Sequence, residues 1–185
     1  MKQSGTMSMR VRSALVGAFI LIAYGILMSA LTESPVIIMI ADIISGLSVI
    51  GIAVLMFPLF RGSDRLLPPA YLVLKFAEGT LMIVGGIIYL DPSMQNLRDL
   101  LYEGIHLYVF IVSGAFFYIL LLRSKPVPGF ISIWGMAGIG ALAISTIFKL
   151  IGSPQAFLDY FLILIITNEV FLAVWLFIKG FNTGG

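Results

Sequence analysis

The stretch Leu72–Leu81, LVLKFAEGTL, lies within an apolar run from Leu66 to Leu90 whose charged residues are Lys75 and Glu78. A run of about 20 predominantly apolar residues is long enough to cross the hydrocarbon core of a bilayer as a helix. Charged residues inside such a helix are rare, because each costs about 2.5–3.5 kcal/mol near the bilayer centre on insertion scales. The stretch therefore predicts a membrane-spanning helix whose two charges point into a bundle.

The composition of the whole chain indicates a membrane protein. Of its 185 residues, 60% are hydrophobic and 11% are charged, whereas soluble domains carry about 25% charged residues. A soluble fold of this length would leave too much apolar surface in water. The chain has no cysteine, which excludes disulfides, thiolate metal sites and cysteine nucleophiles.

Six apolar runs of membrane-crossing length follow one another, separated by short polar or helix-breaking segments such as RGSDR and RSKPVPG. We predict an all-α fold, a polytopic six-helix transmembrane bundle that forms a single domain over residues 1–185. We expect the first run to be a retained span, because Met28 interrupts the small-residue pattern of a signal-peptide cleavage site. The predicted spans are Val11–Leu31, Pro35–Phe60, Leu66–Leu90, Leu97–Leu122, Phe130–Ile151 and Phe157–Lys179.

The lysines and arginines outside the spans are distributed unevenly across this predicted bundle. Eight fall on one side, and only Arg98 and Lys149 fall on the other. Because cytoplasmic loops carry the excess of Lys and Arg, we expect both termini in the cytoplasm and a multi-pass protein of the plasma membrane. The eight residues are Lys2, Arg10, Arg12, Arg61, Arg65, Arg123, Lys125 and Lys179.

Ionisable residues inside the predicted spans form the candidate site. Glu78 and Glu169 each lie twelve residues into their spans, which is near the midplane. Lys75 precedes Glu78 by three residues, and Glu103 precedes His106 by three, so each pair shares a helix face. Intramembrane charges usually face the bundle interior and find partners there. We therefore predict a ligand- or ion-binding cluster in the outer half of the bundle, made of Lys75, Glu78, Glu169, Asp42, His106 and Glu103.

The partner of Lys75 stays open at this point, because both Glu78 and Glu169 lie at a suitable depth. A buried ion pair that fixes helix register explains these residues as well as a binding site does. The Glu-x-x-His spacing also occurs in carboxylate-bridged metal bundles, but those need two copies. Only one copy is present, at Glu103 and His106, so we expect no metal site. No catalytic signature or cofactor motif is recognisable.

Three segments carry a family resemblance: YLVLKFAEGTLMIVGG (71–86), VPGFISIWGMAGIGALAI (127–144) and NEVFLAVWLFIKGFN (168–182). They resemble the prokaryotic membrane family called domain of unknown function 4386. That family shows a Pro-x-x-(Leu/Ile)-Ser-x-Trp-Gly stretch, an acidic residue opening the last span and a closing Trp-Leu-x-x-Lys-Gly-Phe. This chain departs from the family at Lys75, where the family more often has arginine. The resemblance implies a six-helix membrane fold and no particular activity. The matching residues are Pro128, Ile131, Ser132, Trp134, Gly135, Glu169, Trp175, Leu176, Lys179, Gly180 and Phe181.

Three functions follow as hypotheses. The first is binding or translocation of a small molecule or ion at the midplane, where transporter sites usually lie. The second is a structural or accessory membrane subunit whose buried charges join its helices. The third is a metal-dependent intramembrane enzyme built around Glu103 and His106. Besides the lipid bilayer, the expected partners are a small-molecule ligand and a second copy or another membrane subunit; nucleic acid is not expected.

Overall fold

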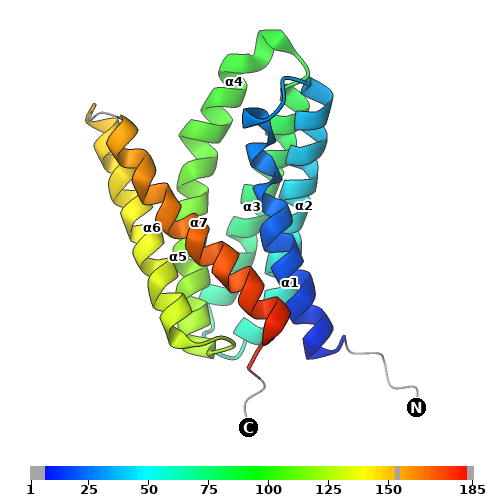
Figure 1. The fold of residues 1–185 in the computed structure, drawn as a ribbon, viewed down its shortest axis with the longest axis vertical. Helices are drawn as coiled ribbons and strands as arrows, with labels where there is room; N and C mark the ends of the chain where they lie inside the picture. The colour runs from blue at the N-terminus through cyan, green and yellow to red at the C-terminus, as the bar shows by residue number, and fades with distance from the viewer. Residues whose placement is uncertain (1–6, 153–154, 183–185) are drawn as a thin grey trace.

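The structure is a computed structural model that describes residues 7–152 and 155–182. Within these residues it contains helices and short loops and no strand (Figure 1), which confirms the predicted all-α fold class. Elements labelled η are 3₁₀-helices, except η3, which is a π-helix. In chain order they are α1 (Met9–Ala23), η1 (Tyr24–Ala30), α2 (Pro35–Phe60), α3 (Leu67–Ile88), η2 (Pro92–Met94), α4 (Gln95–Asp99), η3 (Leu100–His106), α5 (Leu107–Ser124), α6 (Gly129–Leu150) and α7 (Gln155–Ile178).

Four helical segments of the described chain are long and apolar enough to cross a membrane. They are α2, α3, the continuous run Pro92–Ser124 and α6. Large apolar side chains on these helices are exposed, for example Leu47 at 57% and Ile133 at 60%. A hydrocarbon environment accounts for such a surface, because water would disfavour it. The protein is therefore an integral membrane protein.

The first predicted span is not one continuous α-helix. The α-helix ends at Ala23, and the chain continues as a 3₁₀-helix from Tyr24 to Ala30. An α-helix of this length is about 22 Å long, and the 3₁₀ segment adds about 14 Å, so together they are long enough to cross a bilayer core of about 30 Å. Because a 3₁₀-helix turns more tightly, the side chains beyond Ala23 point in directions that an α-helical pattern does not predict.

The long helices form a closed ring in which each packs against two neighbours. The order around the ring is α1, α2, α3, α5, α6, α7 and back to α1. An apolar core includes aromatic contacts among Phe60, Tyr71 and Phe117, with Phe60 edge-on to both other rings. In this ring α7 lies opposite α3, so that side chains from these two helices can meet across the axis.

Helices α2 and α3 approach each other closely at Gly46 and Gly79. A Cβ atom on either glycine would lie 2.5 Å from the carbonyl oxygen of the other. Small residues allow this close approach between membrane helices. Because Gly79 faces α2, the preceding residue, Glu78, is rotated by about 100° around the helix and points into the ring. The glycine contact therefore sets the direction of the glutamate.

The closing motif of the chain has a structural explanation. Gly180 has a φ of 76°, a left-handed conformation that glycine adopts without a Cβ clash at helix C-termini. Its N–H donates to the Trp175 carbonyl oxygen at 3.3 Å. Phe181 is then buried, and the Asn182 N–H donates to the Pro126 carbonyl oxygen at 2.7 Å. The motif ends α7 and attaches the chain beyond it to the loop between α5 and α6.

The start of α1 and the end of α7 lie at the same end of the ring (Figure 1). The Arg10 guanidinium donates to the carbonyl oxygens of Phe177 at 2.7 Å and Ile178 at 3.1 Å, and a cation at a helix C-terminus complements the helix dipole. The assignment of this end to the cytoplasm stays a prediction. Lys2, one of the eight residues behind it, lies outside the described residues.

The loop between α2 and α3 is held by Asp64. Its Oδ1 accepts hydrogen bonds from the N–H groups of Leu66 at 2.8 Å and Leu67 at 3.0 Å, and Arg123 of α5 forms an ion pair with Oδ2. The N–H groups of Leu67 and Leu66 and the Arg123 guanidinium favour the carboxylate and lower the pKa of Asp64 below its ordinary value.

Candidate functional site

Lys75 and Glu78 of α3 form a direct ion pair inside the ring. The Lys75 Nζ lies 2.9 Å from each carboxylate oxygen of Glu78. Lys75 is 8% exposed and Glu78 is 2% exposed. The sequence left the partner of Lys75 open between two glutamates, and in the structure it is Glu78. The ammonium also lies 5.4 Å from the ring centroid of Phe110, which adds a cation–π attraction.

Ser113 of α5 adds a third contact to this pair. Its hydroxyl donates a hydrogen bond to Oε2 of Glu78, and Ser113 is fully buried. The bond crosses from α5 to α3, so Glu78 joins two neighbouring helices. Both oxygens of Glu78 thus have partners, as buried polar groups in folded proteins usually do.

Glu169 lies on α7, across the ring from α3. The hydroxyl of Tyr24, at the start of η1, donates a hydrogen bond to its Oε2 at 2.7 Å. Among the described residues, the ion pairs are Lys75 with Glu78, Arg98 with Asp42 and Arg123 with Asp64. Glu169 therefore has a hydrogen-bond donor but no basic side chain at ion-pair distance within the described part of the chain.

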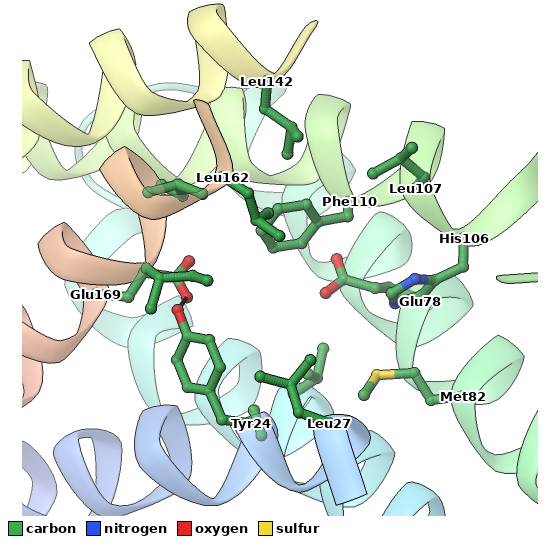
Figure 2. Close-up of a pocket in the computed structure, with 14 residues that line it drawn as sticks. Tyr24, Leu27, Glu78, Met82, His106, Leu107, Phe110, Leu142, Leu162 and Glu169 are labelled. Atoms are coloured by element: carbon green, nitrogen blue, oxygen red, sulfur yellow. Dashed lines mark hydrogen bonds between the residues drawn. The ribbon is translucent and has the colours of Figure 1, made fainter. Parts of the chain in front are cut away.

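A cavity of about 190 Å³ lies between the two glutamates. Figure 2 shows the carboxylates of Glu78 and Glu169 on opposite sides of it. An adjoining cavity of about 60 Å³ shares both glutamates with the larger one and is also lined by Lys75 and Tyr71. The rest of the larger lining is mainly apolar and includes Leu27, Val49, Phe110, Leu142, Leu162 and Ile165.

His106 lines the larger cavity beside Glu78 (Figure 2). Its Nε2 is buried and has no hydrogen-bond partner among the described residues. His106 ends the π-helix η3, and the i→i+5 hydrogen bonds of a π-helix change the angular spacing on which the predicted shared face of Glu103 and His106 rested. The side chain of Glu103 lies outside the described part of the structure.

Asp42 lies apart from the cavities, on α2. It is fully buried, and its Oδ2 lies 3.6 Å from the guanidinium of Arg98 in α4. The Arg98 guanidinium also lies 4.4 Å and 4.6 Å from the ring centroids of Tyr89 and Tyr102. The structure thus divides the predicted cluster in two: Lys75, Glu78, His106 and Glu169 line the cavities, and Asp42 pairs with Arg98 outside them.

Sequence reasoning missed Tyr24, Ser113 and Arg98. No pattern marks Tyr24 or Ser113, because tyrosine and serine also occur in membrane helices without a special role. Arg98 entered the sequence-based prediction only as a basic residue on the outer side of the membrane, outside the candidate site. The signal that could have identified it is Asp42 itself, because a carboxylate inside a span needs a partner and Arg98 was predicted on the same outer side of the bundle.

Within residues 7–152 and 155–182, no three His, Asp or Glu side chains are grouped closely enough to hold a metal ion. Glu78 and His106 lie beside each other, but Lys75 and Ser113 already occupy the Glu78 carboxylate.

Comparison with known proteins supports the family resemblance. The sequence profile of one family matches residues 28–180, and the family is described as a domain of unknown function (DUF4386). This range includes Lys75, Glu78, His106 and Glu169, but it begins after Tyr24. No curated protein and no solved structure matched the chain.

Proposed function

This integral membrane protein belongs to the DUF4386 family, whose description names no activity, and we propose that it binds a small molecule inside its ring of helices. The observation that carries the proposal is the cavity of about 190 Å³ between Glu78 and Glu169. An apolar cavity of about 150 Å³ is large enough to hold benzene. Intramembrane carboxylates that line a cavity commonly mark ligand or ion sites.

Blocking the cavity tests this proposal. Val49 of α2 lines both cavities, so Val49→Phe should fill the space with its ring. Val54 lies on the same helix and is 51% exposed, so Val54→Phe is the matched control. We expect benzylamine or benzyl alcohol to bind the parent and Val54→Phe, measured by calorimetry in detergent micelles, and not Val49→Phe. If neither probe binds the parent, or if binding survives Val49→Phe, the proposal is wrong.

A second candidate is a structural or accessory membrane subunit with no ligand. The direct, buried pair of Lys75 and Glu78, completed by Ser113, favours it, because such contacts serve to join helices. The same experiment separates the two candidates, since an accessory subunit leaves the cavity empty of both probes.

The orientation in the membrane belongs to this proposal as well. The excess of basic residues at the end where α1 begins and α7 ends supports a cytoplasmic position for that end, in the plasma membrane. Because the chain has no cysteine, single cysteines can report sidedness. We expect an impermeant maleimide to label Asn96→Cys in intact cells and to label Gly62→Cys only after lysis. The reverse pattern would contradict the orientation.

A further inference from the structure

The charges around the cavities do not balance among the described residues. Lys75 neutralises Glu78 at 2.9 Å, whereas Glu169 receives only the hydroxyl of Tyr24. The imidazole of His106, the basic side chain in the described lining of the larger cavity, lies beside Glu78 rather than Glu169 (Figure 2). Glu169 therefore shares the smaller cavity with Lys75 but has no cation of its own at ion-pair distance among the described residues. A buried carboxylate is costly in its charged form unless a proton or a cation compensates it.

Unused hydrogen-bonding groups line the smaller cavity together with Glu169. Tyr24 bonds Oε2 of Glu169, which leaves Oε1 without a partner in the described chain. Tyr71 lines the smaller cavity together with Glu169. It is 0% exposed, and its hydroxyl has no hydrogen-bond partner among the described residues. A fully buried hydroxyl without a partner is uncommon, so a polar ligand group in the smaller cavity would supply the hydrogen bond that Tyr71 lacks.

The walls of the larger cavity favour an apolar body on the ligand. Leu27, Leu142, Leu162 and Ile165 contribute aliphatic side chains. Phe110 contributes an aromatic ring that lines both cavities. Aromatic faces attract organic cations, and aliphatic walls favour an uncharged hydrocarbon group by the hydrophobic effect. The lining thus combines one uncompensated negative charge with a mostly apolar surface.

We propose, on the basis of the binding function above, that the cavity selects a small organic cation, a primary amine with an apolar body about the size of a benzene ring. The ammonium group binds the carboxylate of Glu169 and donates a hydrogen bond to the hydroxyl oxygen of Tyr71. The apolar body occupies the larger cavity, which Phe110 and Leu162 line. An ammonium has three N–H donors and no acceptor, which matches the unused acceptors of Glu169 and Tyr71.

Two probes of similar size test the charge preference. Benzylamine is protonated at neutral pH, and benzyl alcohol is neutral. A hydrogen bond between charged groups contributes about 1.5–3 kcal/mol, so we expect the parent to bind benzylamine at least about tenfold more tightly than benzyl alcohol. Calorimetry in detergent micelles measures both, with Val49→Phe as the blank for probe that partitions into detergent.

Variants at the site assign the preference to Glu169. Glu169→Gln keeps the shape and the acceptor oxygen, and it should lower benzylamine affinity by about tenfold or more while benzyl alcohol affinity stays the same. The matched control is Glu33→Gln, in the exposed loop before α2, which should change neither. Should Glu169→Gln fail to fold, Tyr71→Phe replaces it, with the same direction expected for benzylamine alone.

The outcomes separate this inference from the proposed function. If the parent binds the two probes with equal affinity and Val49→Phe binds neither, the cation preference is wrong but the binding function stands. A proton on Glu169 would then compensate its charge. The same holds if Glu169→Gln binds benzylamine as the parent does. If neither probe binds the parent, both the inference and the binding function are wrong.

Discussion

Replacing Glu78 by leucine should destabilise the protein by stranding Lys75. The lysine is 8% exposed, and both oxygens of its partner lie 2.9 Å from Nζ. A lone cation near the centre of a membrane helix costs about 2.5–3.5 kcal/mol on insertion scales. The lost hydrogen bond from Ser113 adds about 0.6 kcal/mol, the average for interhelical hydrogen bonds in membranes. We therefore expect Glu78→Leu to lower the free energy of unfolding by about 3–4 kcal/mol.

Double variants separate the stranded charge from other effects. Lys75→Met combined with Glu78→Leu should recover most of the loss, because no buried cation remains; the residual loss should be about 1 kcal/mol. Glu169→Leu is the contrasting variant, since Glu169 forms no ion pair with Lys75 among the described residues. Adding Lys75→Met to Glu169→Leu should therefore recover none of the free energy of unfolding that Glu169→Leu loses.

Reversible unfolding by sodium dodecyl sulfate in mixed micelles, followed by circular dichroism, measures these free energies. The reasoning is refuted if Glu78→Leu unfolds at the same denaturant fraction as the parent. It is also refuted if the double variant is no more stable than Glu78→Leu, because the loss would then come from packing and not from the unpaired lysine.

Three further predictions concern the rest of the fold. Arg98→Met removes the cation that faces the fully buried Asp42, and it should lower the free energy of unfolding by about 2–3 kcal/mol. Adding Asp42→Asn should restore part of the lost stability. If Arg98→Met unfolds like the parent, the pair contributes no stability and this prediction is wrong. Gly180→Ala should lower the free energy of unfolding by about 1–2 kcal/mol, because the φ of Gly180 is 76°. The control is Gly140→Ala, whose added Cβ atom would meet no atom within 4 Å, and it should be neutral or stabilising. Equal effects of the two variants would contradict the conformational argument. The stabilisation from Asp64, whose pKa is lowered in the fold, is present above its unfolded pKa of about 3.9 and is lost as the pH falls through the lower folded value. Asp64→Asn should therefore weaken the fall of the melting temperature below about pH 4, and an unchanged fall would disprove this role.

Much of the helical structure follows from the sequence. The apolar runs predict helices because, in lipid, a chain must satisfy its backbone hydrogen bonds internally. The predicted range Pro35–Phe60 coincides with α2, and Leu66–Leu90 differs from α3 by at most two residues at either end. The runs Val11–Leu31 and Leu97–Leu122 are exceptions, because no local pattern announces the change to a 3₁₀-helix at Tyr24 or to a π-helix at Leu100. The partner of Glu169 was missed for this reason.

The candidate site was predicted in part. Lys75 and Glu78 lie three residues apart on one helix, so their pairing is a local property that the spacing already suggests. His106 and Glu169 were predicted to join them, and both line the same cavity. Asp42 was grouped with them by depth alone, and depth along a helix says nothing about which side of the bundle that helix occupies.

The sequence by itself determined the membrane environment, the helices and the local pair of Lys75 and Glu78, because hydrophobic run length and residue spacing act within one segment. Only the tertiary structure decided that α7 lies opposite α3, that Glu169 meets Tyr24 while Asp42 meets Arg98, and that a cavity separates the two glutamates. The physical reason is that the order and rotation of helices in lipid depend on close contacts between segments far apart in the chain, such as Gly46 against Gly79.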